Sequence, residues 1–191
     1  MSYDKCVAIV GNRSATIYAK QKAKEYSKLL VDKGYTIVSG LARGIDREAH
    51  LGALDSDYGN TISVLAWMNP IYPSKHKKLA LDIEKRGAIT SELYNQPRDY
   101  GNNRAYSRSR FIVRNRIISG LSNFIIAVES GASGGTIWQT ELALLQNKPV
   151  YTFKPIDKTN KDKMNGYNRM IKMGAKTITN LSDLSKLYVY N

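Results

Sequence analysis

Three glycine-rich segments, each following an apolar run, carry side chains suited to binding an anion. They are Gly11-Asn12-Arg13-Ser14, Ser39-Gly40-Leu41-Ala42-Arg43-Gly44-Ile45-Asp46 and Ser130-Gly131-Ala132-Ser133-Gly134-Gly135-Thr136. Glycine lets a backbone approach a ligand closely, and the N-terminus of a following helix offers unpaired N–H groups and partial positive charge. Ser14, Ser133 and Thr136 add hydroxyls, and Arg13 and Arg43 add charge. Each segment alone could be a tight turn with a serine cap, but the three together favour a phosphate site.

The segment 104–116 is the most basic part of the chain. It holds five arginines and two aromatic residues, which are Arg104, Tyr106, Arg108, Arg110, Phe111, Arg114 and Arg116. In a helix, Arg110 and Arg114 share a face, whereas Arg114 and Arg116 lie about 160° apart. We therefore expect one of Arg114 and Arg116 to reach the anion site beside Asn115. The other should pair with a carboxylate such as Asp46, Glu92 or Glu129, and the sequence leaves open which arginine does which.

Several common chemistries find no support in the residues. A Gly-x-Gly-x-x-Gly fingerprint and a Walker A lysine are both absent, which argues against NAD and against a nucleoside triphosphatase. The one cysteine, Cys6, lies in an apolar run and is expected in the core. His50 has no nucleophile at a suggestive spacing and is interpreted as a packing residue, and His76 among lysines is expected to be exposed. We predict no catalytic residue, no metal ligand and no cofactor.

The elements that must position these residues alternate between strand and helix. Apolar, β-branched runs predict strands at 6–10, 35–39, 61–65, 88–90, 124–128 and 150–153. Helical spacing predicts helices at about 14–33, 45–55, 74–86, 104–121 and 133–146, and polar loops at 93–103 and 154–163. Short elements at 167–173, 176–178 and 181–188 end the chain. This order predicts an α/β fold, a Rossmann-like three-layer domain with a mostly parallel sheet, formed by residues 1–191 as a single domain.

The charge balance favours a polyanionic partner. Lys and Arg number 29 against 16 Asp and Glu, a formal net charge of +13. Neutralising phosphates releases condensed counterions, so such a surplus suits a nucleic acid, although a basic, solvated surface would give the same count. No apolar run reaches the ~20 residues that a membrane span requires, and no signal sequence precedes the first strand. The expected location is the cytoplasm, away from membranes.

Six segments, in this order, resemble the Rossmann-like core of the DprA/Smf family. They read VAIVGNRSAT, IVSGLARGIDREAHLGAL, GNTISVLA, YPSKHKKL, RFIVRNRIISGLS and GYNRMIKMGA, and they fall within residues 6–175. The resemblance implies a recombination mediator that binds single-stranded DNA without sequence preference, forms a homodimer and helps to load a RecA-type recombinase during transformation. It implies DNA contacts at Arg13, at Arg114 and Arg116, and at Lys75 or Lys77. The loop argument adds Arg43 and the turn at Ser133 and Gly134 to the same region.

The sequence departs from the family pattern at three points. The N-terminal helical and C-terminal winged-helix domains that many members carry have no room in 191 residues. Asn12 replaces a small residue of the first loop. Trp67 and Met68, in AWMNPIYP, replace two flexible glycines. An aromatic ring there could stack on a base or fill the core; we expect Met68 in the core and leave Trp67 open.

Two alternative functions use the same pocket. Ser133-Gly134-Gly135-Thr136 followed by Glu141 approaches the Gly-Gly-x-Gly-Thr-x-x-Glu motif of LOG-type nucleoside-monophosphate phosphoribohydrolases, but Glu141 comes two residues late and would lie on another helix face. A sensor that binds a mononucleotide without cleaving it is the other alternative. The surplus of basic residues outside the three loops favours single-stranded DNA over both. We further expect Arg13→Ala and Arg114→Ala to weaken DNA binding without unfolding the protein.

Overall fold

The computed structural model describes residues 5–96, 104–180 and 183, with only the backbone of residues 104–108. The strands are β1 (Cys6–Val10), β2 (Thr36–Ser39), β3 (Thr61–Val64), β4 (Ala88–Thr90), β5 (Phe124–Ala127), β6 (Val150–Phe153) and β7 (Lys176–Ile178). The helices are α1 (Ile17–Val31), α2 (Ile45–Leu54), α3 (Lys77–Arg86), α4 (Arg104–Gly120), α5 (Gly135–Leu145) and α6 (Lys161–Met173). A 3-10 turn, η1 (Ser74–His76), precedes α3.

The seven strands form one sheet in the order β4-β3-β2-β1-β5-β6-β7, and each neighbouring pair is parallel. The chain first adds strands on one side of β1 and then returns to the other side, where Val7 of β1 pairs in register with Phe124 of β5. The strand order therefore reverses at β1 and β5, and their carboxyl ends mark the switch point at which such sheets bind ligands. The prediction of a Rossmann-like fold with a mostly parallel sheet is confirmed.

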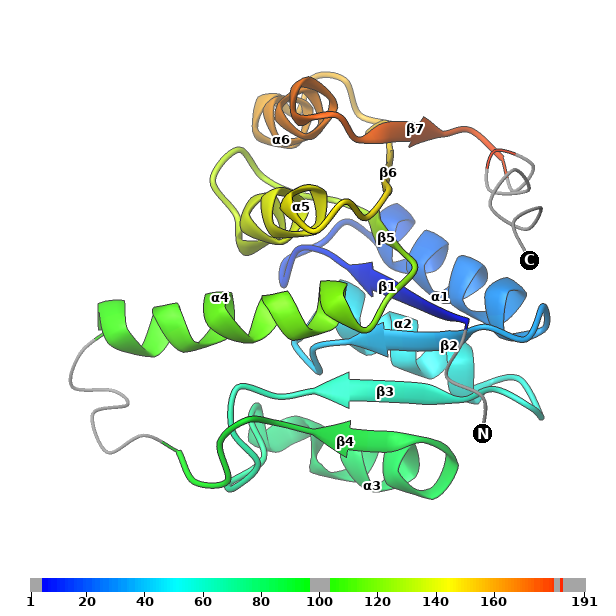
Figure 1. The fold of residues 1–191 in the computed structure, drawn as a ribbon. Helices are drawn as coiled ribbons and strands as arrows, with labels where there is room; N and C mark the ends of the chain where they lie inside the picture. Colours follow the sequence, from blue (N-terminus) through cyan, green and yellow to red (C-terminus); the bar gives the residue numbers. More distant parts are fainter. Residues whose placement is uncertain (1–4, 97–103, 181–182, 184–191) are drawn as a thin grey trace.

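Helices cover both faces of the sheet, with α1–α3 on one face and α4–α6 on the other (Figure 1). Alternate residues of β1 point to opposite faces of the sheet and belong to two separate cores. Val7 and Ile9 pack with α1 and α2, while Ala8 and Val10 pack with α4–α6. Because both faces are covered, β1 is buried along its whole length. This burial explains why the strand is a continuous apolar run rather than an alternating one. Cys6 lies in this core, as expected.

Side-chain caps fix the helix ends that differ from the sequence prediction. Thr16 caps α1, its hydroxyl accepting a hydrogen bond from the Ala19 N–H at 3.2 Å. Asn160 does the same for the Lys163 N–H at 3.2 Å, so α6 begins at Lys161, inside the expected lysine-rich loop, and is longer than the element predicted at 167–173. The element expected at 181–188 lies, apart from residue 183, outside the described residues.

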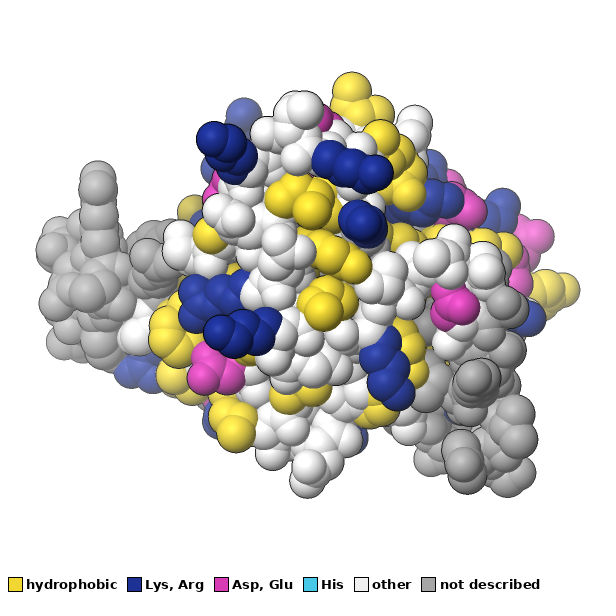
Figure 2. All heavy atoms as spheres, turned by 90° about the horizontal axis from the view of Figure 1, so that it is seen from above, with side chains coloured by type: hydrophobic (Ala, Val, Ile, Leu, Met, Phe, Trp, Pro, Cys, Tyr) yellow, Lys and Arg dark blue, Asp and Glu magenta, His cyan; other side chains and the backbone are white. Residues whose placement is uncertain are grey.

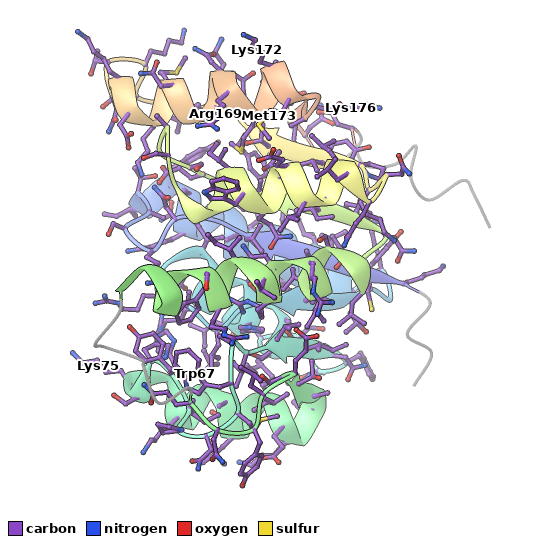
Figure 3. The ribbon with its side chains drawn as sticks, turned by 60° about the vertical axis from the view of Figure 1, so that its left-hand side comes forward. Trp67, Lys75, Arg169, Lys172, Met173 and Lys176 are labelled. Atoms are coloured by element: carbon purple, nitrogen blue, oxygen red, sulfur yellow. The ribbon has the colours of Figure 1, made fainter. Side chains whose placement is uncertain are left out.

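Basic side chains dominate the charged surface. The face above α6 and β7 carries Lys and Arg side chains interspersed with apolar and uncharged ones, with fewer carboxylates (Figure 2). Lys172 and Lys176 lie along this edge (Figure 3), and both are exposed. Within the described residues, no helix is long and apolar enough to cross a membrane.

Candidate nucleic-acid interface

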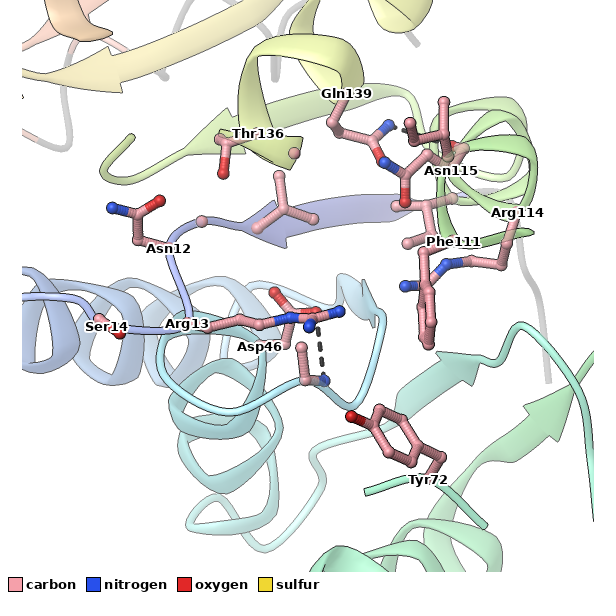
Figure 4. A pocket seen from close by; sticks show the side chains of 16 residues that line it. Asn12, Arg13, Ser14, Asp46, Tyr72, Phe111, Arg114, Asn115, Thr136 and Gln139 are labelled. Carbon is pink, nitrogen blue, oxygen red and sulfur yellow. Dashed lines mark hydrogen bonds between the residues drawn. The ribbon is translucent and has the colours of Figure 1, made fainter. Parts of the chain in front are cut away.

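A cleft of about 810 Å³ opens at the switch point of the sheet (Figure 4). Its sides come from the loop after β1, the loop between β2 and α2, the N-terminus of α5 and the inner face of α4. Tyr72, from the segment before α3, closes one side. The lining residues are Val10, Gly11, Asn12, Arg13, Ser14, Ala42, Asp46, Tyr72, Phe111, Ile112, Arg114, Asn115, Ile118, Gly135, Thr136 and Gln139.

The first loop is held by a carboxylate from the other half of the sheet. Glu129, just after β5, accepts hydrogen bonds from the Thr16 N–H at 3.2 Å and the Thr16 hydroxyl at 2.7 Å. The Lys163 ammonium lies 3.1 Å from the same carboxylate, and both side chains are largely buried. The Glu129 carbonyl also accepts from the Asn12 N–H at 2.9 Å. A carboxylate of the protein therefore occupies the anion position at the N-terminus of α1.

The second loop is closed by a buried pair of opposite charges. The Arg114 guanidinium donates to the carbonyls of Gly40, at 3.0 Å, and Val64. Asp46 accepts from the Ala42 N–H at 3.3 Å. A Cβ on Gly40 would collide with the Arg114 guanidinium and come within 2.7 Å of Asp46 Oδ2, so glycine is required for both groups to approach the loop.

Burial disfavours the ionised form of both Asp46 and Arg114, and the opposite charge of each group partly offsets this effect on the other. Burial raises the pKa of Asp46, and the positive charges of Arg114 and Arg13 act against that shift. Burial lowers the pKa of Arg114 to about 10, while Asp46 opposes this change. Arg114 therefore stays protonated at neutral pH, and its positive charge favours the ionised form of Asp46.

The third loop is fixed by α6. Asp162 accepts from the Ala132 N–H at 3.0 Å, and Arg169 donates to the Ala132 carbonyl at 3.0 Å. Gly166 lets the helix lie directly against the Ser130 carbonyl, where a Cβ would clash. In each of the three glycine-rich loops, a backbone N–H or a helix N-terminus is thus bonded to one of the protein's own carboxylates.

The rim of the cleft combines one exposed arginine with an aromatic wall. The Arg13 guanidinium lies over the Phe111 ring, 5.2 Å from its centroid. The ring of Tyr72, 39% exposed, is 5.8 Å from that of Phe111. Opposite them, Thr136 and Gly135 open the N-terminus of α5, which has no side-chain cap, into the cleft. In proteins that bind single strands, aromatic ring faces stack on bases, and arginines and the N–H groups of helix N-termini bind phosphates.

Arg114 and Arg116 point to different sides of α4, as their spacing on the helix requires. Arg114 lines the cleft, whereas the exposed Arg116 forms an ion pair with Glu92. Asn115 lies between them, and its carbonyl accepts from the Gln139 side chain at 3.1 Å. Arg114 thus lines the cleft close to the Asp46 carboxylate, and Arg116 ties α4 to the loop after β4. Which of the two contacts a bound anion stays a prediction.

The cleft gathers about half of the residues predicted for the site. Those that line it are Gly11, Asn12, Arg13, Ser14, Arg114, Asn115 and Thr136. Ser39, Gly40 and Gly44 lie buried beneath it, and the Ser39 hydroxyl is bonded to the Ile9 carbonyl at 2.7 Å. The remaining predicted residues do not line the cleft: Arg43, Lys75, Arg116 and Ser133 are exposed, and Arg110 and Gly134 are half-buried. Lys75 projects outward from the segment before α3 (Figure 3).

Sequence reasoning missed Tyr72, Gly135 and Gln139 and did not assign Phe111 to the site. Gln139 lies on α5 one turn after Thr136, so helical spacing from the glycine-rich turn could have identified it. Tyr72 lies between Pro70 and Pro73, in an irregular segment that has no helical or strand periodicity from which to predict it. The departure at Trp67 and Met68 is resolved: Trp67 is buried with 2% exposure, and Met68 packs half-buried on the core under α3.

The two histidines are structural groups. His50 is fully buried, and its Nδ1 is 2.7 Å from the Thr61 hydroxyl. His76 is also buried, with Nδ1 2.8 Å from the Leu41 carbonyl, so the expectation that it is exposed is wrong. Its lysine neighbours misled the prediction, because His76 alone turns inward at the end of η1. Glu141 is exposed on α5 and does not line the cleft. The described residues contain no cluster of three or more potential metal-ligating His, Cys, Asp or Glu side chains.

Comparison with known proteins agrees with this architecture. The family of DNA recombination-mediator protein A matches residues 1–188. Protein Smf of Escherichia coli is 36% identical over 184 residues, which are 91% of this chain and 44% of that protein. DNA processing protein DprA of Bacillus subtilis is 32% identical over 190 residues, 96% of this chain and 59% of that protein. The chain thus spans about half the length of these curated relatives.

A solved structure of DNA processing protein A from Helicobacter pylori, described for its single-stranded DNA binding mode, superposes with a TM-score of 0.82. It is 27% identical in sequence, over 99% of this chain and 84% of that one. The family resemblance found in the sequence motifs is therefore confirmed. The chain belongs to the DprA/Smf family of DNA recombination mediators.

Proposed function

We propose that this chain binds single-stranded DNA without sequence preference and acts in recombination as a mediator rather than as an enzyme. The observation that carries the proposal is the open cleft in which the exposed Arg13 lies beside the aromatic wall of Phe111 and Tyr72. A base can stack on the wall while Arg13 and the N-terminus of α5 pair with phosphate oxygens. Every base has a flat face and every nucleotide a phosphate, so such contacts do not depend on sequence.

The other predicted basic residues extend this contact outside the cleft. Arg43 and Lys75 are exposed on the two segments that supply Ala42 and Tyr72 to the cleft, and Ser133 is exposed at the turn before α5. In the proposed complex they follow the backbone of the strand on either side of the inserted nucleotide. The buried Gly40, Gly44 and Arg114 act indirectly, because they shape the loop on which the strand rests.

A mononucleotide-binding protein is the second candidate. A cleft of about 810 Å³ is large enough to enclose one nucleotide. Cleavage of that nucleotide, as in a phosphoribohydrolase, is disfavoured, because the exposed Glu141 does not line the cleft. A general acid or base must reach its substrate within hydrogen-bond distance.

A competition titration separates the two candidates. Fluorescent oligo-dT is titrated with protein at 50 mM and 200 mM salt, with duplex DNA and AMP as competitors. The proposal predicts tight binding that weakens at least tenfold at the higher salt and resists AMP. Binding of AMP with no binding of oligo-dT would favour the mononucleotide candidate, and release of adenine from AMP would show an enzyme.

The partners belong to the same proposal. We propose a homodimer in the cytoplasm that transfers single-stranded DNA to a RecA-type recombinase. Light scattering after gel filtration measures the oligomeric state. The rate at which recombinase assembles on coated single strands, with and without this protein, measures loading. A monomer, or an unchanged rate, would remove the corresponding part of the proposal.

A further inference from the structure

Trp67 lies directly behind the aromatic wall of the cleft. Its ring centroid is 5.3 Å from that of Phe111, in an edge-to-face arrangement, and 5.8 Å from that of Tyr72. Phe111 and Tyr72 line the cleft and Trp67 does not. Trp67 is 2% exposed and lies beneath α4 (Figure 3), so it is out of reach of a base in the cleft. It can act on a ligand through the two rings that it contacts.

The backbone around Trp67 is fixed on both sides. The indole Nε1–H donates to the Pro70 carbonyl at 3.0 Å, within the same turn that carries Tyr72. The next two residues, Met68 and Asn69, donate their N–H groups to the carbonyls of Leu93 and Tyr94 at 2.8 Å and 2.6 Å. The indole is therefore satisfied internally, and its ring cannot leave Phe111 without breaking these bonds.

The three rings come from two parts of the chain. Trp67 and Tyr72 belong to the segment between β3 and η1, whereas Phe111 projects from α4. Arg13, whose guanidinium lies over the same Phe111 ring, comes from a third part of the chain, the loop after β1, which is held by the hydrogen bond from the Asn12 N–H to the Glu129 carbonyl. A stacking platform that is held in place before binding loses less conformational entropy when a base arrives.

We propose that Trp67 is a positioning residue for base stacking: it holds Phe111 and Tyr72 in the orientation that a nucleobase requires. This inference rests on the proposed binding of single-stranded DNA. It divides the binding energy into a part that depends on bases, which requires Trp67, and a part that depends on phosphates, which requires Arg13. If Trp67 only filled the core, its loss would weaken both parts equally.

The experiment compares oligo-dT with an abasic oligomer of the same length for the parent, Trp67→Leu, Trp67→Phe and Trp138→Phe. Trp138, on α5, is 45% exposed and does not line the cleft, so it is the matched control. Stacking of one base typically changes affinity by roughly five- to a hundredfold. We expect the parent to prefer oligo-dT by at least fivefold and Trp67→Leu to lose most of this preference. Affinity for the abasic oligomer and its salt dependence should not change, and Trp67→Phe should retain the preference.

An unchanged preference in folded Trp67→Leu, or equal losses for both oligomers, would overturn the inference while leaving the proposed function intact. A parent protein that binds neither oligomer would overturn both. If Trp67→Leu does not fold, the Trp138→Phe variant decides, because Trp67 is then the one tryptophan of the chain. Its fluorescence should change on binding oligo-dT and not on binding the abasic oligomer; no change with either would overturn the inference.

Discussion

Two regions at the carboxyl edge of the sheet use arginine in opposite ways. The inner layer, formed by Gly40, Asp46 and Arg114, is buried, and its arginine donates to two backbone carbonyls. The rim, formed by Arg13, Phe111 and Tyr72, is open, and its arginine lies on a ring at the mouth of the cleft. Burial, more than residue type, therefore decides whether a charge maintains the fold or remains available to a ligand.

The largest effect is expected for Arg114→Ala. Removing the guanidinium deprives the buried Asp46 of the larger of the two positive charges that favour its ionised form, and the Gly40 and Val64 carbonyls lose their donor. Loss of one partner of a buried pair typically costs about 3–5 kcal/mol, so the variant should be strongly destabilised in urea denaturation. This differs from the sequence expectation that the protein would stay folded. Adding Asp46→Asn should recover part of the loss; no recovery would show that the two groups are not coupled.

The free energy of unfolding should depend on pH through His50, which is buried in the interior. Burial lowers the pKa of His50 to about 3, and the nearby charges of His76 and Arg114 add to the shift. The unfolded state takes up this proton near pH 6.5 and the folded state near pH 3, so stability falls as the pH decreases through this window. The contribution is at most about 1.4 kcal/mol per pH unit, or about 3 kcal/mol between pH 6.5 and 4.5.

The control for this titration is His50→Asn, which lacks the titrating group. Its free energy of unfolding, measured in urea from pH 7 to pH 4.5, should fall less steeply than that of the parent, even if it is lower at pH 7. Equal slopes would mean that His50 is not kept neutral by burial.

Gly40→Ala tests how closely the inner layer is packed. The added Cβ would overlap the Arg114 guanidinium and Asp46 Oδ2, so one of them must move. Overpacking of this kind costs about 1–3 kcal/mol, which chemical denaturation would measure. Gly135→Ala, at a position with no atom within 4 Å of the added Cβ, is the control and should change stability by less than about 1 kcal/mol. Similar losses in both variants would refute the steric argument.

Arg13→Ala should affect binding and leave the fold intact. Arg13 is exposed, so its loss removes a phosphate contact and the cation over Phe111 without opening the core. We expect about tenfold weaker binding of oligo-dT, about 1.4 kcal/mol, a shallower salt dependence and an unchanged urea midpoint. Lys33→Ala, exposed at the end of α1, is the control. Unchanged affinity in Arg13→Ala would remove Arg13 from the interface.

Arg116→Ala should have the smallest effect. Arg116 and Glu92 pair on the surface, where their side chains are 50% and 46% exposed. Such pairs contribute about 0–1 kcal/mol because water and salt screen them. A urea midpoint close to that of the parent, beside the large loss in Arg114→Ala, would complete the contrast between two arginines that are neighbours on one helix. A loss comparable to that of Arg114→Ala would contradict it.

The sequence predicts the elements well because their patterns are local. The apolar run at Cys6–Val10 and the short strands at 88–90 and 150–153 match the structure at both ends. Contacts between separate segments explain the differences: the Thr16 N–H binds Glu129, 113 residues away, and the Ala132 N–H binds Asp162, 30 residues away. No local pattern encodes such pairs. For the same reason, the burial of His76 and the contact between Trp67 and Phe111 could not be derived from spacing.

The reversal of strand order at β1 and β5 also has a consequence for how the protein is made. As the chain leaves the ribosome, β1 can pair with β2 early, but its other edge waits for β5, and the Cys6 N–H meets the Asn123 side chain across 117 residues. Such long-range pairing is slow, and domains grow from the N-terminus during synthesis. The cleft spans this junction, so it is completed only after the chain has emerged as far as Gln139. Truncated products would therefore lack a binding site even where their first four strands had folded.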